Sequence, residues 1–383
     1  MRILHLVSYP LFSGPMPSTV ALAVAQRDRG HEVWLAFDRK RGAFNAYEEA
    51  AAPSVEQAGL TAPAPFTLST KSSVREYWRD WRTLKKLVHA GGVDVVHFHF
   101  SHDHGLGALA GRGSPAVTRV RTIHAARSLL PRFGQRWLMR RADGFIVRCD
   151  DHRRRLTEAF AVPPAHIRVV KGSVDTRRFS PPPIDARVDA RRQFELPLDV
   201  PVVCHVAFMA GRGQEELAHG AAELGSRAPH LLFVGRGEGE PGLRALVDRL
   251  GIGQRVRFAG YLQGNALLKA YAASDAAFLA QAGNDASARA ALEAMACGLP
   301  LIAVTGEALA ELCQPEVGFP IERRDAAAVA LALGRWLESA DRGKARGQAG
   351  RKLVVAERSV AQEAAATVAF YEALRGGAAS PLQ

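Results

Sequence analysis

The chain has 383 residues, with 50 lysines and arginines against 38 aspartates and glutamates, and a net charge of +12. This length predicts more than one domain, and a composition of 48% hydrophobic and 23% charged residues excludes a disordered or collagen-like chain. The positive excess lies in residues 1–200, which hold 31 basic and 19 acidic side chains, whereas residues 201–383 hold 19 of each. A basic half beside a neutral half argues against a protein that binds polyanions over its whole surface.

The sequence shows no targeting segment. Met1-Arg2 is followed by only the short run Ile3–Val7 before Ser8, which is too short for a signal-peptide core. No stretch approaches the roughly 18 apolar residues of a membrane-spanning helix, and the four cysteines lack Cys-x-x-Cys spacing. We therefore expect a cytoplasmic protein with reduced thiols, acting at most at the inner face of the cytoplasmic membrane.

The first 180 residues alternate short apolar runs with helical patterns, such as those over residues 18–29 and 73–89. Strands that alternate with helices of this length predict βαβ units and a parallel sheet covered by helices. The predicted strands are Ile3–Val7, Glu32–Phe37, Val93–Phe98, Ala116–Ile123 and Gly144–Val147.

A proline run, Pro181–Pro183, interrupts this rhythm, because proline continues neither a helix nor an interior strand. A short helix is expected over residues 187–194, and then strands and helices alternate again. The strands predicted there are Val202–Phe208, His230–Val234, Arg255–Phe258, Ala276–Leu279 and Leu301–Val304.

The predicted fold is therefore α/β, with two Rossmann-like doubly wound domains. The first is assigned to residues 1–183 and the second to residues 184–357. The last helix, over residues 359–375 of the C-terminal segment 358–383, has no strand after it and is expected to pack back on the first domain. Chains of this kind bind ligands at the carboxyl ends of their strands, so the ligand is expected in a cleft between the domains.

The most informative segment is a loop of small residues and the helix after it, Gly283–Pro300. Small residues let a ligand approach the backbone, and the helix start offers N–H groups and a positive dipole end to a diphosphate. Asp285 and Glu293 lie eight residues apart, so both can face one ligand. An alternative stays open: a capped core helix with Asp285 as its N-cap and Glu293 on the surface.

The run Leu292–Ala303, LEAMACGLPLIA, resembles the signature of retaining glycosyltransferases of the GT-B fold, family 4. That signature reads E-x₇-E followed by A-M-A-x-G-x-P. Other segments resemble the same family in order and spacing through nearly the whole chain. They are Gly30–Val33, Asp94–His99, His124 at the end of its strand, Val174–Pro181 and Phe258–Tyr261.

The resemblance implies a nucleoside diphosphate sugar as donor substrate, no cofactor and no metal, and no convincing Asp-x-Asp motif is seen. It implies that Asp285 meets the hydroxyl groups of the donor sugar and that Glu293 meets the ribose. The N–H groups of Ser287, Ala288 and Arg289 would meet the diphosphate.

The resemblance also assigns residues to the rest of the donor. His124 and Ser13-Gly14 would face the transferred sugar from the first domain. Tyr261 would lie beside the base, and Gly235 belongs to a segment that resembles the family's V-G-x-G loop.

Three departures from the family pattern stand out. Asp285 replaces the first glutamate, and residues 286–288 replace the usual G-F-G. Phe208 stands where the family has a diphosphate-binding arginine, and Arg212 is the nearest match to its lysine. We hypothesise that Arg289 replaces the missing cation, because a guanidinium in the first helical turn opposes the dipole and makes little structural sense there. The alternative is a solvent-facing arginine.

Two further patterns are weaker evidence for a function. Gly237–Gly242 matches GxGxxG, but the next strand ends without the acidic residue that a dinucleotide ribose needs. A histidine-rich cluster resembles a metal site but misses the order of metallohydrolases, so core and cleft histidines are expected instead. Its members are His97, His99, His102, Asp103 and His104.

Two features bear on the acceptor. The helix over residues 73–89 carries Trp78 and Trp81 among basic residues, which suits an anionic membrane surface, although packing of its apolar stripe on the sheet is the stronger interpretation. Residues 112–178 hold 16 basic and 5 acidic groups, which favours a phospholipid surface or an anionic glycolipid unless these arginines are simply solvated.

The leading hypothesis is a retaining hexosyl- or related glycosyltransferase that moves a sugar to a glycan or lipid-linked acceptor in bacterial polysaccharide or lipopolysaccharide synthesis. The first alternative is a GT-B protein that binds sugar nucleotides with low or lost activity, motivated by Phe208 and Asp285. A remote alternative is a nucleic-acid-binding protein, motivated only by the pI near 10 and supported by no motif, so no nucleic-acid partner is expected.

Overall fold

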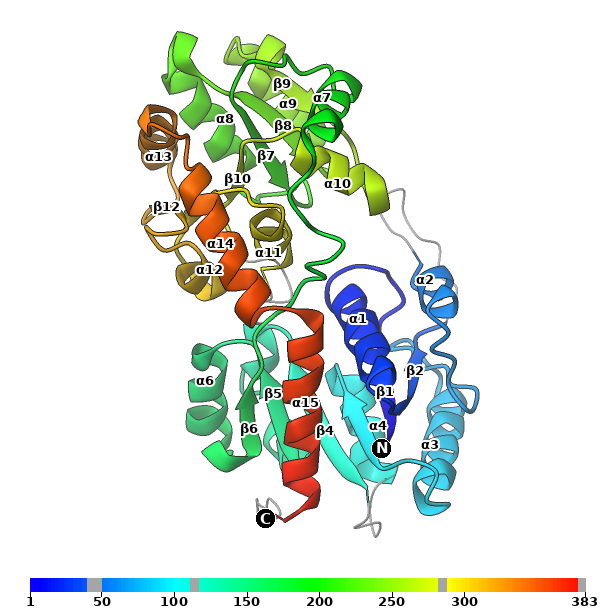
Figure 1. Cartoon of the computed structure of the whole chain (residues 1–383). Coiled ribbons are helices and arrows are strands. Elements are labelled where there is room, and N and C mark those ends of the chain that lie inside the picture. The colour runs from blue at the N-terminus through cyan, green and yellow to red at the C-terminus, as the bar shows by residue number, and fades with distance from the viewer. Residues whose placement is uncertain (40–49, 111–116, 282–287, 378–383) are drawn as a thin grey trace. The chain divides into compact units, whose positions relative to one another are not determined.

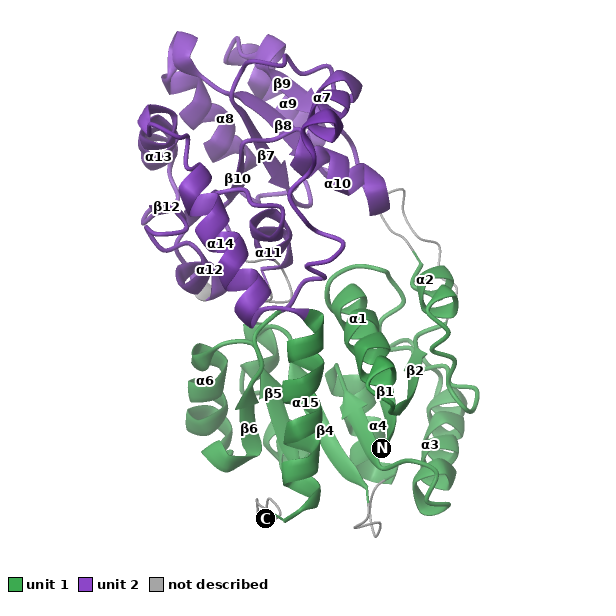
Figure 2. Cartoon of the chain, in the orientation of Figure 1, with its two compact units in different colours: residues 1–172, 284–286, 360–383 green, residues 173–283, 287–359 purple. Residues whose placement is uncertain are grey.

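The computed structural model describes residues 1–39, 50–110, 117–281 and 288–377, which form two compact units (Figures 1 and 2). The first unit contains residues 1–172 and the segment from Val360 onward, and the described part of the second runs from Ser173 to Ser359. Val174 already pairs with Ser359 in a parallel bridge, and its N–H donates to the Arg358 carbonyl at 2.9 Å. The boundary therefore lies before the proline run, at residue 172 and not at 183.

The first unit is built on a six-stranded parallel sheet of order β2-β1-β3-β4-β5-β6. The five predicted strands are present with ends shifted by two residues at most, and a sixth strand of three residues was not predicted. The strands are β1 (Arg2–Val7), β2 (Glu32–Phe37), β3 (Val95–Phe98), β4 (Thr118–Ile123), β5 (Gly144–Val147) and β6 (Ile167–Val169).

Helices cover both faces of this sheet because successive strand residues point to opposite sides. Ile3 and Val7 pack with α1 and α15, whereas Leu4 and Leu6 pack with α3 and α4. Helix α3 begins at a capping box, in which Ser73 Oγ accepts from the Glu76 N–H and Glu76 Oε2 accepts from the Ser73 N–H. The helices are α1 (Pro15–Asp28), α2 (Ala52–Gln57), α3 (Val74–His89), α4 (Ser101–Ala110), α5 (Gln135–Met139), α6 (Asp150–Phe160) and α15 (Val360–Arg375).

The C-terminal helix α15 belongs to the first unit although it follows the second in sequence (Figure 2). Phe370 and Tyr371 enter the core formed by β1, β3 and β4. A Cβ at Gly144 on β5 would lie 2.6 Å from Leu374 Cδ1 and 2.8 Å from Phe370 Cζ, so a larger residue there would displace these two side chains of α15. An ion pair between Glu363 of α15 and Arg148, 2.5 Å apart, is buried in the same unit.

The second unit repeats the architecture with strand order β12-β11-β10-β7-β8-β9, all parallel. The edge strand β12 was not predicted, because its sequence Gly-Phe-Pro-Ile contains two residues that are unfavourable in strands; proline is tolerated at an edge. The strands are β7 (Val202–Val206), β8 (His230–Val234), β9 (Val256–Phe258), β10 (Ala276–Leu279), β11 (Leu301–Val304) and β12 (Gly318–Ile321).

Two hydrophobic cores lie on opposite faces of this second sheet. Val203, Phe233 and Phe278 pack with α8, α9 and α13 around the fully buried Trp336. Cys204 and Leu232 face the other core, with α7, α10 and α11. The helices are α7 (Ile184–Gln193), α8 (Gln214–Glu223), α9 (Glu240–Arg249), α10 (Gly264–Ala272), α11 (Arg289–Ala296), α12 (Glu307–Leu312), α13 (Ala326–Glu338) and α14 (Lys344–Glu357).

Among the described residues, no helix combines the length and the apolar character needed to cross a bilayer.

Candidate functional site

In the second unit, the loops that follow β7, β8 and β9 are joined through their backbones. The N–H of Gly235 donates to the Gly260 carbonyl at 2.8 Å, and the N–H of Ala207 donates to the Val234 carbonyl at 3.0 Å. Gly235 has φ of 149°, and a Cβ there would lie 1.9 Å from the Ala207 oxygen. The loop after β8 therefore requires glycine at 235, and the three loops form one rigid edge.

Tyr261 lies on this edge, directly after the β9 loop, with 42% of its surface exposed. The Arg236 guanidinium lies 4.0 Å above the tyrosine ring, and Gln263 Nε2 donates to the tyrosine hydroxyl at 2.6 Å. An exposed ring held by an arginine offers a flat surface on which a planar group can stack.

Helix α11 carries Glu293 with its carboxylate buried inside the second unit. Glu293 is 7% exposed, and the Tyr271 hydroxyl donates to its Oε2 at 2.8 Å. Burial, and then the neighbouring carboxylate, raise the pKa of Tyr271 well above its usual value, which keeps the hydroxyl as a donor. The alternative of a surface glutamate is wrong, because the Glu293 side chain is buried and its carboxylate accepts a specific hydrogen bond.

Arg289 begins the same helix and faces Glu293. Its Nε lies 3.6 Å from Glu293 Oε1, and its side chain is 40% exposed. Ala288, just before it, has φ of 52°, a left-handed conformation that starts the helix abruptly. Arg289 is therefore neither fully solvated nor buried, and it pairs with the acid that the family resemblance assigns to the ribose.

Arg212 and Phe208 lie in the loop after β7. Phe208 is 44% exposed at the position where the family pattern has arginine. With the Gln281 amide oriented to satisfy its neighbours, its oxygen accepts from Arg212 Nη1 at 3.0 Å and from Nε at 3.2 Å. Arg324, which the sequence did not suggest, donates to the Gly211 carbonyl at 2.8 Å. Two guanidinium groups therefore flank this loop.

In the first unit, the loop before α1 is tied to the end of β4 through aromatic rings. Ser13 Oγ and the Tyr9 hydroxyl lie 2.9 Å apart, Tyr9 stacks on Phe100 at 5.6 Å, and Phe100 lies 6.3 Å from the His124 ring. Gly14 has φ of 53° at the start of α1. Ser13, Gly14 and His124 thus line the same edge of the first sheet.

Buried histidines gather behind that edge. His5 and His97 pair across β1 and β3, and His99 and His124 follow the ends of β3 and β4; all four are 5% exposed or less. Burial lowers the pKa of His5 to about 4 and the pKa of His97, His99 and His124 well below the usual value. These imidazoles are neutral at pH 7.

One group of three, His5, His97 and His99, has ring nitrogens within 4.8 Å of one another. Hydrogen bonds already occupy these nitrogens: His5 Nδ1 lies 3.0 Å from His99 Nε2, and both His97 nitrogens contact hydroxyl groups. A metal ion there would have to displace these bonds.

The other members of the histidine-rich cluster point elsewhere. Asp103 accepts from the backbone N–H groups of Phe100 at 2.8 Å, Ser8 at 3.2 Å and His99 at 3.3 Å. Burial outweighs these bonds and raises the pKa of Asp103 to about 7. His104 lies 3.2 Å from Arg121 Nη1. Asp103 therefore holds the ends of β1 and β3 together and takes no part in a ligand set with the histidines.

Comparison with known proteins identifies this arrangement. Residues 17–178 match the family described as Glycosyltransferase Family 4, and residues 187–353 match the family described as Glycosyl transferases group 1. The chain belongs to glycosyltransferase family 4.

Similar proteins agree with this assignment. The D-inositol 3-phosphate glycosyltransferase of Actinosynnema mirum is 31% identical over 239 residues, which cover 56% of this chain and 56% of that protein. The GDP-mannose-dependent alpha-(1-6)-phosphatidylinositol monomannoside mannosyltransferase of Mycolicibacterium smegmatis is 27% identical over 362 residues, 90% of this chain and 91% of that protein. The chain thus spans little more than half the length of the first relative.

The fold agrees with GT-B glycosyltransferases of known structure. HepE of Anabaena, solved in complex with UDP, has a TM-score of 0.81 at 17% identity, covering 97% of this chain and 100% of that one. The predicted α/β GT-B fold, with two parallel six-stranded sheets, is thereby confirmed.

For this family 4 glycosyltransferase, the candidate site residues divide into two groups. Those of the second unit that the structure describes lie at the carboxyl ends of its strands, at the N-cap of α11 or on α11 itself, namely Arg212, Gly235, Tyr261, Ala288, Arg289 and Glu293. Those of the first unit, Ser13, Gly14 and His124, lie at the corresponding edge of the first sheet. Asp285 and Ser287 lie outside the described residues.

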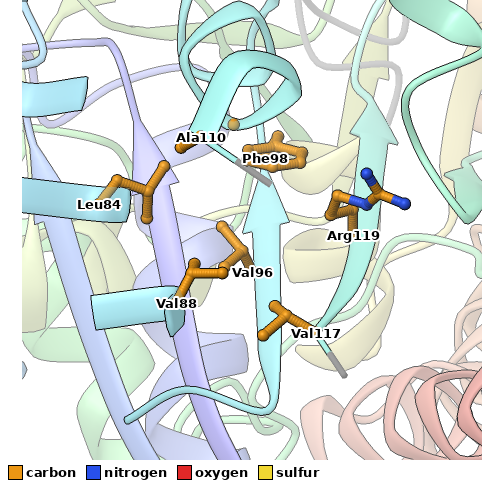
Figure 3. Close-up of a pocket in the computed structure, with 8 residues that line it drawn as sticks. Leu84, Val88, Val96, Phe98, Ala110, Val117 and Arg119 are labelled. Carbon is orange, nitrogen blue, oxygen red and sulfur yellow. The ribbon is translucent and has the colours of Figure 1, made fainter. Parts of the chain in front are cut away.

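Tyr271 and Arg324 could not be found from the sequence, because neither is part of a motif and each reaches its partner only through packing. A small apolar pocket between α3, β3 and α4 is unrelated to the site (Figure 3). Its one charged lining residue, Arg119, pairs with Asp143 at 2.7 Å, so the pocket offers no polar group to a substrate.

Proposed function

We propose that this protein transfers a sugar from a nucleoside diphosphate sugar to a glycan or glycolipid acceptor, with retention of the anomeric configuration. The observation that carries the proposal is the Glu293 carboxylate, buried one turn into α11 and held by Tyr271 at 2.8 Å. A buried acid one turn from a helix N-terminus suits a ligand that carries both hydroxyl groups and phosphates.

The donor is proposed from the second unit. Glu293 receives the ribose hydroxyls, Tyr261 supports the base, and the N–H groups at the start of α11 receive the diphosphate, with Asp285 and Ser287 as further contacts. The Mycolicibacterium relative is GDP-mannose-dependent, and the Anabaena neighbour was solved with UDP, which supports a nucleoside diphosphate hexose. The two names specify different bases, so they do not decide the base of the donor for this protein.

The donor assignment is tested by calorimetry of the full chain with UDP, GDP and ADP, followed by turnover with the corresponding hexoses in EDTA. One of the three nucleotides is expected to bind well above the others, and Glu293→Ala is expected to weaken that binding. Equal, weak binding of all three would contradict the assignment. Turnover that requires added divalent metal would contradict our proposal that the reaction is metal-independent.

Arg289 is proposed as the cation that neutralises the leaving diphosphate. A guanidinium grips phosphate through two hydrogen bonds, and Arg289 already lies at the start of α11. Replacement by alanine is expected to lower donor affinity about tenfold, which corresponds to the loss of one charge-assisted hydrogen bond.

Arg212→Ala is the matched comparison and is expected to have the smaller effect, with Arg289→Lys intermediate. The reverse order, in which Arg289→Ala changes nothing and Arg212→Ala abolishes binding, would reject this role for Arg289.

We propose that the first unit contacts an anionic membrane surface and receives the acceptor there. On α3, Leu84 and Val88 are buried in the core, whereas Val74 is 79% and Trp78 is 50% exposed. The Arg82 guanidinium covers Trp78 at 4.9 Å, so this part of the helix is both aromatic and basic. A second such surface near α5 carries exposed Phe133 and Trp137, with Arg141 above Trp137 at 5.2 Å.

Exposed aromatic rings beside arginines suit the interface of an anionic bilayer. The double variant Trp78→Ala/Phe133→Ala is expected to reduce co-sedimentation with phosphatidylglycerol vesicles several-fold, without changing binding of the free nucleotide. Leu331→Ala, which removes an exposed apolar residue from the second unit, is the control. Equal loss of co-sedimentation in the double variant and in Leu331→Ala would reject membrane binding through these two surfaces.

A sugar-nucleotide-binding protein of low activity is the second candidate. Phe208, exposed where the family has an arginine, favours it. Tight binding of a nucleotide sugar, without release of nucleoside diphosphate in the presence of any acceptor, would support this candidate over the first.

A further inference from the structure

Three of the buried histidines in the first unit form a continuous chain of hydrogen bonds. The chain begins at Gln26 on α1 and ends at His124, after β4. Gln26 Oε1 lies 2.8 Å from His5 Nε2, His5 Nδ1 lies 3.0 Å from His99 Nε2, and His99 Nδ1 lies 2.9 Å from His124 Nε2.

The direction of this chain follows from its first bond. A carbonyl oxygen only accepts, so His5 must carry its proton on Nε2 and present a bare Nδ1. His99 must then donate from its Nε2 to His5, and its own Nδ1 must accept. His124 in turn donates from Nε2, which leaves its Nδ1 as an unprotonated lone pair.

This direction requires that each imidazole ring is neutral and carries one proton on its nitrogens. Burial lowers the pKa of His5 to about 4 and holds the pKa of His99 and His124 well below the usual value, so all three are neutral at pH 7. The chain is therefore a set of identical tautomers arranged head to tail.

A second branch from Gln26 agrees with this direction. Its Nε2 donates to the Tyr371 hydroxyl at 3.4 Å, and that hydroxyl lies 2.6 Å from His97 Nδ1. His97 Nε2 lies 2.7 Å from Thr122 Oγ1. Tyr371 can thus donate to His97, which donates to Thr122, so the branch is compatible with this direction.

Exchanging the oxygen and nitrogen of the Gln26 amide would reverse the direction of the hydrogen bonds in both branches. His124 would then hold a proton on Nδ1, an atom that is buried and has no hydrogen-bond partner among the residues that the structure describes. An orphaned N–H in a buried site is rarer and more costly than an unused acceptor. The orientation with a bare Nδ1 is therefore favoured.

We propose that Gln26, His5 and His99 are positioning residues that hold His124 as the Nε2–H tautomer, so that its Nδ1 accepts a hydrogen bond from a substrate hydroxyl. The identity of that hydroxyl as one on the transferred sugar rests on the proposed function. His124 is 5% exposed and directly follows β4, at the edge where parallel sheets bind ligands. A bare lone pair accepts from a sugar hydroxyl but cannot donate to a phosphate oxygen, so this position selects the sugar over the diphosphate.

The tautomer is measured directly by nitrogen-15 NMR of the histidine rings in the full-length protein at pH 7.5. The signals of His124 are assigned by their loss in His124→Gln. An Nε2–H tautomer for His5, His99 and His124 is the expected result. A proton on Nδ1 of His124, or an imidazolium, overturns the proposal, and this measurement needs no activity.

Variants test whether the hydrogen-bonded chain from Gln26 to His124 affects turnover of the substrate. Gln26→Leu removes the first acceptor, so His124 is expected to populate both tautomers and turnover to fall about tenfold, with unchanged affinity for the free nucleotide. Gln26→Glu keeps an acceptor for His5 and is expected to restore both the tautomer and most of the turnover. Thr122→Val is the matched control, because it removes a buried hydroxyl from the other branch and leaves the chain to His124 intact.

A Gln26→Glu protein as slow as Gln26→Leu, or a Thr122→Val protein equally slow, would overturn the positioning role in favour of a purely structural one. Absence of sugar transfer in the unmodified protein would reject the proposed function but leave the tautomer result standing. The two claims therefore fail separately.

Discussion

Replacing Glu293 by alanine is expected to lower sugar transfer by about two orders of magnitude while leaving the fold of the second unit intact. The carboxylate is buried on α11, and a charge-assisted hydrogen bond to a ligand in such an environment contributes up to about 3 kcal/mol. The loss should appear in both donor affinity and turnover, measured as release of nucleoside diphosphate.

Two variants separate the roles of the charge and of its orientation. Glu293→Gln keeps the size and removes the charge, and should lose most of the activity. Tyr271→Phe removes only the hydroxyl that holds Glu293 Oε2 and should lose about tenfold. Glu316→Ala, an exposed acid of the same unit, should change nothing. Full activity of Glu293→Ala would show that this acid does not touch the donor.

Replacing Glu363 by glutamine is expected to destabilise the first unit by about 3–5 kcal/mol, since it leaves a buried charge without its partner. Arg148 and Glu363 have side chains only 3% and 2% exposed, and Arg148 Nη1 lies 2.5 Å from Glu363 Oε1. Arg148 Nη1 also donates to the Val170 carbonyl at 3.2 Å, a bond too weak to compensate for a lost carboxylate.

Amide hydrogen exchange of β1, β4 and α15 measures this effect within the first unit, without assuming that the whole chain unfolds in one step. The protecting free energy of α15 should fall most. Glu372→Gln, at an exposed position of the same helix, is the control and should change protection by less than about 0.5 kcal/mol. Similar protection in both variants would mean that α15 is held by its apolar contacts alone.

Much of the fold could be predicted from the sequence because the central strands are buried on both sides. Such strands are continuous apolar runs between helical patterns, and all eight of them were located from that pattern, together with the edge strands β2 and β9. The edge strands β6 and β12 were missed because they are short and one contains glycine and proline. The unit boundary was misplaced because the pairing of Val174 with Ser359 joins residues far apart in sequence.

The candidate site was only partly predictable. The helix that carries Glu293 followed from residue type and spacing, but its carboxylate is held by Tyr271, which no motif contains. His97 and His99 were expected in the core or a cleft, and they do lie buried. The contribution of His5 could not be foreseen, because it arises from the register in which β1 pairs with β3.

This family 4 glycosyltransferase is expected to move a sugar onto an acceptor. Mass spectrometry of lipid-linked and phosphoinositide acceptors, after incubation with the nucleotide hexose that binds best, tests it most directly. The expected result is an acceptor heavier by one hexose, with an equimolar release of nucleoside diphosphate, in the unmodified protein but not in Glu293→Ala. Tight nucleotide binding without any glycosylated product, or equal product from both proteins, would contradict the account.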